Sequence, residues 1–146
     1  AVDVSRDALV IARKNAETHR VWDRIELVQS DLFAKLDSTQ RFAAIVSNPP
    51  YVKRGEWNGL HPDVRMHEPK LALEGGDDGL DVARRIIGSA GEFLLAEGLL
   101  LLELSPETIH GAKSLLEAMP QFDSVGIIRD TAGKQRVLTA RRTTRE

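Results

Sequence analysis

The sequence predicts an α/β fold built on a mostly parallel sheet. Apolar segments of strand length alternate with segments that carry apolar residues at helical spacing, which is typical of parallel strands joined by helices. Leu99 to Leu104 is almost wholly apolar, as expected for a central strand covered on both faces. Val125 to Arg129 and Val137 to Ala140 are joined by a short polar segment, so we expect them to form an antiparallel pair at the end of the chain.

The first part of the chain alternates strands with one helix. Ala1 to Val4 is predicted to be the end of a strand, and a helix to about Thr18 follows, with Ser5 as its N-cap. Ile25 to Gln29 is predicted to be a short strand. Phe42 to Ser47 is a further apolar strand, and it ends there because the two prolines that follow cannot donate hydrogen bonds to a strand ladder.

The second part begins with a long polar stretch, residues 52–79, which we expect to be a functional or a mobile loop. It ends in a glycine-rich turn, Gly75 to Gly79. An amphipathic helix is predicted from Leu80 through Leu94, with Gly98 closing it before the apolar strand. Pro106 is predicted to open the last helix.

Composition narrows the class of protein. The chain has 146 residues and a mass of 16.2 kDa, so we expect one domain over residues 1–146. It contains no cysteine, which excludes disulfides, thiolate zinc sites and cysteine nucleophiles, and we expect no metal site. No apolar run has the roughly 20 residues of a membrane-spanning helix, so we expect no membrane association and a cytoplasmic protein.

Polar residues follow three of the predicted strands: Asp3, Asp31 and Asn48. Ligands of open α/β sheets bind beyond the carboxyl ends of the strands. The Asn48 side chain and the Pro49 carbonyl offer two acceptors to a single NH2 group, and Tyr51 offers a flat wall. The alternative is an ordinary proline turn in which the asparagine is bonded to its own backbone.

Several motifs carry a resemblance to a known family. They are a strand followed by Asn48-Pro49-Pro50-Tyr51, the stretch from Leu60 through Glu68-Pro69 to Leu80, the strand Leu100 to Glu103, and Asp130 to Val137. Over nearly its whole length the chain resembles bacterial protein-(glutamine N5) methyltransferases that act on peptide-chain release factors. The resemblance implies a class I methyltransferase (Rossmann-like) sheet and S-adenosylmethionine as cofactor.

The resemblance also implies roles for individual residues. Asp3 would bind the ribose hydroxyls of the cofactor, and Asp31 would accept from its adenine amino group, with Leu32 and Phe33 beside the ring. Asn48, which we also count among the cofactor contacts, and Pro49 would hold the glutamine amide, with Pro50 and Tyr51 packed against it. Without the resemblance, Asp3 and Asp31 are as well explained as solvated or helix-capping residues.

The chain departs from the family at its start. The first strand and the glycine loop that should hold the methionine part of the cofactor are missing, so we expect an N-terminally truncated catalytic domain, or a partner chain that completes the sheet. Two rival functions stay open: methylation of amino groups in nucleic acids, against which the net charge of −2 argues, and a non-catalytic fragment or interaction module.

Overall fold

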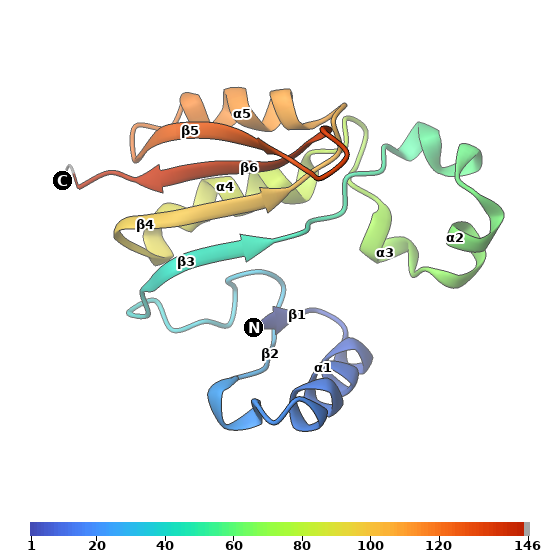
Figure 1. Ribbon diagram of the computed structural model, residues 1–146, viewed down its shortest axis with the longest axis horizontal. Coiled ribbons are helices and arrows are strands. Elements are labelled where there is room, and N and C mark those ends of the chain that lie inside the picture. Colours follow the sequence, from blue (N-terminus) through green and yellow to red (C-terminus); the bar gives the residue numbers. More distant parts are fainter. Residues whose placement is uncertain (145–146) are drawn as a thin grey trace. The chain divides into compact units, whose positions relative to one another are not determined.

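The structure is a computed structural model that describes residues 1–144. The chain forms two compact units, Ala1–Gln40 and the residues from Arg41 onward, and each is described by itself (Figure 1). The predicted α/β class is confirmed, since strands and helices alternate along the chain. The single domain expected over residues 1–146 stays a prediction.

The first unit combines a two-stranded parallel sheet with one long helix. Its elements are β1 (Val2–Asp3), α1 (Arg6–Thr18), the 3-10 helix η1 (Trp22–Arg24) and β2 (Val28–Gln29). The helix α1 starts where the sequence predicts, because the Ser5 hydroxyl accepts a hydrogen bond from the Ala8 amide at 3.2 Å. The predicted strand from Ile25 is wrong in its first half, because only Val28–Gln29 pairs with β1.

The second unit contains a four-stranded mixed sheet in the order β3-β4-β6-β5 (Figure 1). The strands are β3 (Phe42–Ser47), β4 (Leu94–Glu103), β5 (Phe122–Arg129) and β6 (Gln135–Arg142). β3 and β4 are parallel, whereas β6 runs antiparallel to both β4 and β5. The predicted antiparallel pair at the end of the chain is therefore confirmed.

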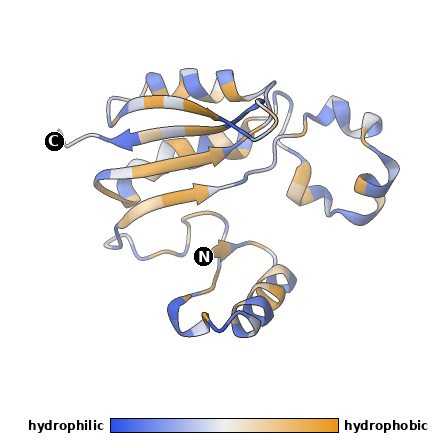
Figure 2. Cartoon of the chain, in the orientation of Figure 1, coloured by the Kyte–Doolittle hydropathy of each residue, from blue (hydrophilic) through white to orange (hydrophobic). Residues whose placement is uncertain are grey.

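Two helices, α4 (Asp81–Phe93) and α5 (Ile109–Glu117), supply the apolar partners of this sheet. Successive side chains of a strand point to opposite faces, so Leu100 and Leu102 of β4 are fully buried while Leu99 is 40% exposed. The expectation that this strand is covered on both faces is therefore wrong. The apolar character of β4 is visible along its length in Figure 2. In the part of the chain that the structure describes, no helix is both long and apolar enough to cross a membrane.

The predicted boundary between helix α4 and strand β4 is wrong. The helix ends at Phe93, and β4 begins at once with Leu94 instead of after Gly98. An irregularity accommodates the extra residues: the pairing with β3 shifts between Phe42 and Ala44, and Glu97 adopts a left-handed φ of 61°. Helix α5 likewise starts at Ile109, after a turn, and not at Pro106.

The long polar segment after β3 is not one irregular loop. It contains the 3-10 helix η2 (Arg54–Gly59) and the short helices α2 (Pro62–His67) and α3 (Lys70–Leu73). Backbone hydrogen bonds close its base, from the Val52 amide to the Leu73 carbonyl at 2.9 Å and from the Gly75 amide to the Val52 carbonyl at 2.8 Å. We call residues 52–74 the excursion; it lies between β3 and α4 in the chain, and its two ends are joined by a bridge between Val52 and Glu74.

Candidate functional site

The first unit brings two predicted acidic residues to one edge of its sheet. Asp3 is the last residue of β1, and it pairs in register with Gln29, the last residue of the parallel strand β2. Asp31 follows two residues later, and both aspartates are exposed. Because parallel strands end at the same edge, the two carboxylates belong to one end of this small sheet.

Asp3 is partly engaged by its own backbone. Its Oδ1 atom accepts a hydrogen bond from the Ser5 amide at 2.8 Å, at the start of α1. Its Oδ2 atom accepts none from residues 1–144. A carboxylate has about four lone-pair sites, so this local bond leaves acceptor capacity for a hydroxyl-bearing ligand.

The backbone next to Asp31 is strained. Leu32 has a φ of 51°, in the left-handed region that a leucine rarely adopts, and such a conformation costs on the order of 1–3 kcal/mol. Leu32 and Phe33 are half-buried. No helix follows Asp31, since residues 31–36 form turns, so the alternative in which Asp31 caps a helix is wrong. Residues held in such conformations cluster at active sites and ligand-binding sites.

The second unit carries the predicted amide-binding segment, Asn48 to Tyr51, directly after the end of β3. Asn48 is exposed, Pro49 is buried, and Pro50 and Tyr51 are half-buried. Among the residues that the structure describes, neither the Asn48 side chain nor the Pro49 carbonyl has a hydrogen-bond partner. The alternative in which Asn48 is bonded within its own turn is therefore not realised, and both acceptors are without a partner among the described residues.

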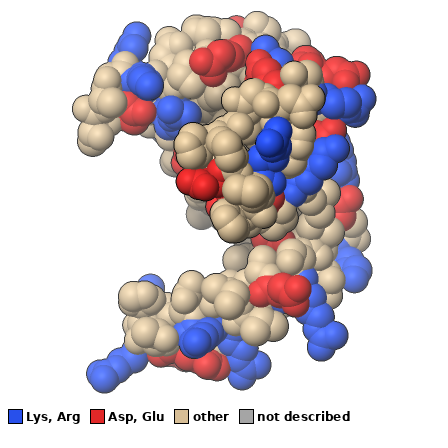
Figure 3. All heavy atoms as spheres, turned by 90° about the vertical axis from the view of Figure 1, so that its right-hand side faces the viewer, with Lys and Arg blue, Asp and Glu red and all other residues tan. Residues whose placement is uncertain are grey.

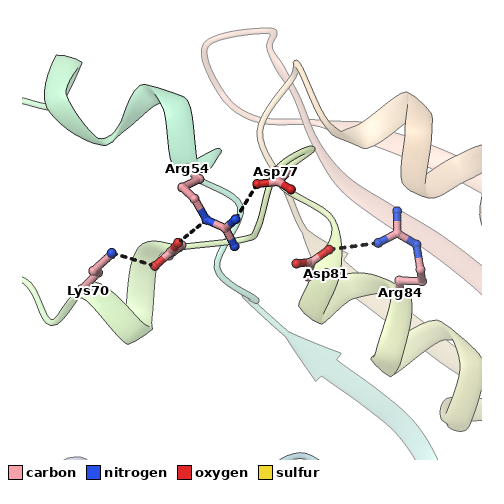
Figure 4. A network of polar contacts seen from close by, with 6 residues as sticks. Arg54, Lys70, Asp77, Asp81 and Arg84 are labelled. Carbon is pink, nitrogen blue, oxygen red and sulfur yellow. Dashed lines mark hydrogen bonds and ion pairs between the residues drawn. The ribbon is translucent and has the colours of Figure 1, made fainter.

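Sequence reasoning did not identify the ion pairs that hold the excursion. Arg54 binds Glu74 at 3.1 Å and Asp77 at 2.8 Å, and Lys70 binds Glu74 at 3.2 Å (Figure 4). The hydrogen bond from Arg54 lowers the pKa of the Glu74 carboxyl, with a further contribution from Lys70. Single exposed ion pairs contribute little, but together they tie η2 to the turn that precedes α4. Twenty residues separate Arg54 from Glu74, so no local pattern signals the pairing.

Glu107, which follows β4, is a second carboxylate that sequence reasoning did not single out. Its own backbone amide and the Ser105 hydroxyl lower the pKa of the Glu107 carboxyl, and the charges of Arg136 and Lys53 act in the same direction. A carboxylate with a lowered pKa is a weak proton acceptor. This group is therefore suited to holding negative charge and poorly suited to general-base catalysis.

Comparison with known proteins shows that the chain is similar to methyltransferases. A family model described as "RMKL-like, methyltransferase domain" matches residues 1–60. The release factor glutamine methyltransferase of Rhodopirellula baltica is 40% identical over 95% of this chain and 47% of its own length. The ribosomal protein uL3 glutamine methyltransferase of Francisella tularensis is 47% identical over 83% of this chain and 37% of its own length. The chain thus spans about half the length, or less, of the curated relatives it matches.

The fold is also shared with solved structures. The crystal structure of ribosomal protein L11 methylase from Lactobacillus delbrueckii subsp. bulgaricus superposes with a TM-score of 0.67 at 17% identity. The match covers 98% of this chain and 57% of that protein. At this identity the likeness establishes the α/β architecture alone.

Proposed function

We propose that this chain methylates the side-chain nitrogen (N5) of glutamine in a protein. The proposal starts from the similarity of the chain to the curated glutamine methyltransferases. The single observation that carries this proposal is the pair of unpartnered acceptors, Asn48 Oδ1 and the Pro49 carbonyl, immediately after β3. Two acceptors held on one rigid segment match the two hydrogens of a primary amide.

These acceptors address the main chemical difficulty, which is the low nucleophilicity of an amide nitrogen. When bound, S-adenosylmethionine supplies an electrophilic methyl group on a positively charged sulfur. Asn48 and Pro49 orient the NH2 group so that the nitrogen lone pair faces that methyl, and their oxygens stabilise the positive charge that develops on nitrogen. The cofactor would supply the methyl group and leave as S-adenosylhomocysteine, and the amide proton would pass to water, so no strong base is required of this chain's residues.

Asp3, Asp31 and Leu32 are our candidates for holding the cofactor. The free Oδ2 atom of Asp3 suits a ribose hydroxyl, and the strained, half-buried Leu32 beside Asp31 suits one face of an adenine ring. The edge of the β1-β2 sheet presents both carboxylates to one ligand, which supports this assignment.

Asp3→Ala should weaken the binding of S-adenosylmethionine by about 5- to 150-fold, because a charge-assisted hydrogen bond contributes roughly 1–3 kcal/mol. Titration calorimetry measures the change. Asp23→Ala removes an exposed carboxylate from η1 in the same unit and serves as the control for net charge. If the Asp3 and Asp23 variants bound S-adenosylmethionine with equal affinity, Asp3 would not be the residue that binds the ribose hydroxyls.

For the substrate we propose a peptide-chain release factor, modified in the cytoplasm, because relatives of that name match 94–96% of the chain. Ribosomal protein uL3 is a second candidate, supported by the 47% identity to the Francisella protein. Nucleic acid is disfavoured by the net charge of −2. On the face drawn in Figure 3, basic and acidic side chains are interspersed and do not form one basic patch.

The test is methyl transfer from labelled cofactor to three acceptors in parallel: a release factor, uL3, and a mixture of tRNA and rRNA. The full-length Rhodopirellula enzyme is the positive control. We expect label on one of the two proteins, and tandem mass spectrometry should place the added methyl on a glutamine side chain. Label in the RNA, or no transfer by this chain while the control enzyme is active, would contradict the proposal.

A further inference from the structure

We propose that Gly75 and Gly79 are positioning residues for the amide-binding segment Asn48 to Tyr51. This inference rests on the proposed function, since it concerns the same substrate-binding segment. Both glycines belong to the Gly75–Gly79 turn, which leads into α4, and both are buried. Their Cα atoms lie so close to the backbone of Pro50 and Tyr51 that a side chain at either position would displace it.

Gly75 lies against the middle of the segment. A Cβ atom at this position would stand 2.7 Å from the Pro50 carbonyl oxygen and 2.8 Å from the Tyr51 Cα. The φ angle of Gly75 is not left-handed, so the close approach alone requires glycine here. The hydrogen bond from the Gly75 amide to the Val52 carbonyl, at 2.8 Å, holds the two backbones at this separation.

Gly79 lies against the end of the segment. A Cβ atom there would stand 2.5 Å from the Tyr51 carbonyl oxygen and 2.9 Å from the Thr108 Cγ2 atom. Ordinary van der Waals contact begins at 3.4 Å, so the Tyr51 carbonyl would have to move by about 0.9 Å. Thr108 is only 3% exposed at the start of α5 and has little room to yield, so the displacement falls on Tyr51.

The turn itself is braced and will not relax readily. The Asp78 carboxylate accepts from the Leu80 amide at 3.0 Å and pairs with Arg84 at 2.7 Å. The hydrogen bond from Arg84 lowers the pKa of the Asp78 carboxyl, so the brace is present at neutral pH. On the other side of the turn, Asp77 is bound by Arg54 (Figure 4). A side chain added at Gly79 therefore pushes the segment more readily than it moves the turn.

The expected consequence is a loss of turnover, because a misplacement of about 1 Å at reacting groups lowers rates by about 10²-fold. Gly79→Ala should reduce kcat for methyl transfer by about that factor. The affinity for S-adenosylmethionine should be nearly unchanged, since Asp3, Asp31 and Leu32, to which we assign the ribose and adenine contacts, lie in the first unit.

The matched control is Gly133→Ala. Gly133 has a φ of 78°, against 79° for Gly79, but nothing lies within 4 Å of the position that its Cβ would take. Both substitutions impose the same left-handed strain, and only one contacts the amide-binding segment. Equal losses of turnover in the two variants would overturn the inference.

A second readout needs no activity. Tyr51 is the only tyrosine of the chain, so selective isotope labelling of tyrosine gives one set of NMR resonances, all from Tyr51. Gly79→Ala should shift the Tyr51 backbone resonances, and Gly133→Ala should leave them in place. Unmoved resonances, or moved resonances with unaltered turnover, would overturn the positioning role. Failure of the unsubstituted chain to methylate any acceptor would instead contradict the proposed function alone.

A second pair of variants covers the case in which Gly79→Ala does not fold. Gly75→Ala carries no left-handed strain, and Gly59→Ala adds a methyl group in open space within η2. We expect the Tyr51 resonances to shift in the Gly75 variant and not in the Gly59 variant. The same response in both would contradict the inference.

Discussion

Asn48→Ala is expected to reduce methyl transfer by about 10²–10³-fold while S-adenosylmethionine binds with nearly unchanged affinity. The substitution removes one of the two acceptors that orient the glutamine NH2 group, and losses of this size follow from removing one group that stabilises developing charge. Single-turnover transfer to the protein acceptor measures the first effect, and calorimetry measures the second.

The control for this prediction is Asn58→Ala. Asn58 is likewise an exposed asparagine of the second unit, but it lies in η2 and not at the end of β3. Transfer by the Asn58 variant should match that of the unsubstituted chain. If Asn48→Ala turned over normally, or lost only cofactor affinity, Asn48 would not be part of an amide-binding pair.

Leu102→Ala is expected to lower the free energy of unfolding by about 2–5 kcal/mol, the cost of a cavity in a packed core. Leu102 is fully buried in β4, and it pairs with Ser47, the last residue of β3 before Asn48. Its loss should therefore loosen the support of the amide-binding segment as well as the core. Urea denaturation gives the change from the transition midpoint at constant slope.

Leu99→Ala is the matched control, since Leu99 lies on the opposite face of the same strand and is 40% exposed. It should cost clearly less than Leu102→Ala, because 40% of Leu99 stays exposed to water in the folded chain. Equal costs for Leu99 and Leu102 would contradict the one-sided core described for β4.

The elements that the sequence predicted well are those with a strong local signal. Phe42–Ser47 is a strand over the predicted residues because two prolines end it, and α1 has the predicted bounds because Ser5 caps it. The start of β4 was predicted wrongly because Gly98 was taken to end the helix, whereas the short apolar run before Glu97 looks alike in a buried helix and in a buried strand. The helices α2 and α3, with six and four residues, are too short to show a period.

The candidate site was also predictable only where a local sequence signal marks its residues. Asp3, Asp31 and Asn48 could be named from the sequence because each follows a strand, and strand ends are where such sheets bind ligands. The close packing of Gly75 and Gly79 against the amide-binding segment could not be predicted, because it depends on backbone contacts between segments more than 20 residues apart in the chain. The sequence predicted a turn at these glycines, and the structure adds what the turn packs against.

The most direct test of the amide-binding pair is a crystal structure of the chain with a glutamine-containing peptide of the methylated protein and S-adenosylhomocysteine. We predict that the glutamine side-chain nitrogen lies within hydrogen-bonding distance, about 2.7–3.2 Å, of both Asn48 Oδ1 and the Pro49 carbonyl oxygen. A peptide whose glutamine nitrogen contacts neither atom would contradict the account.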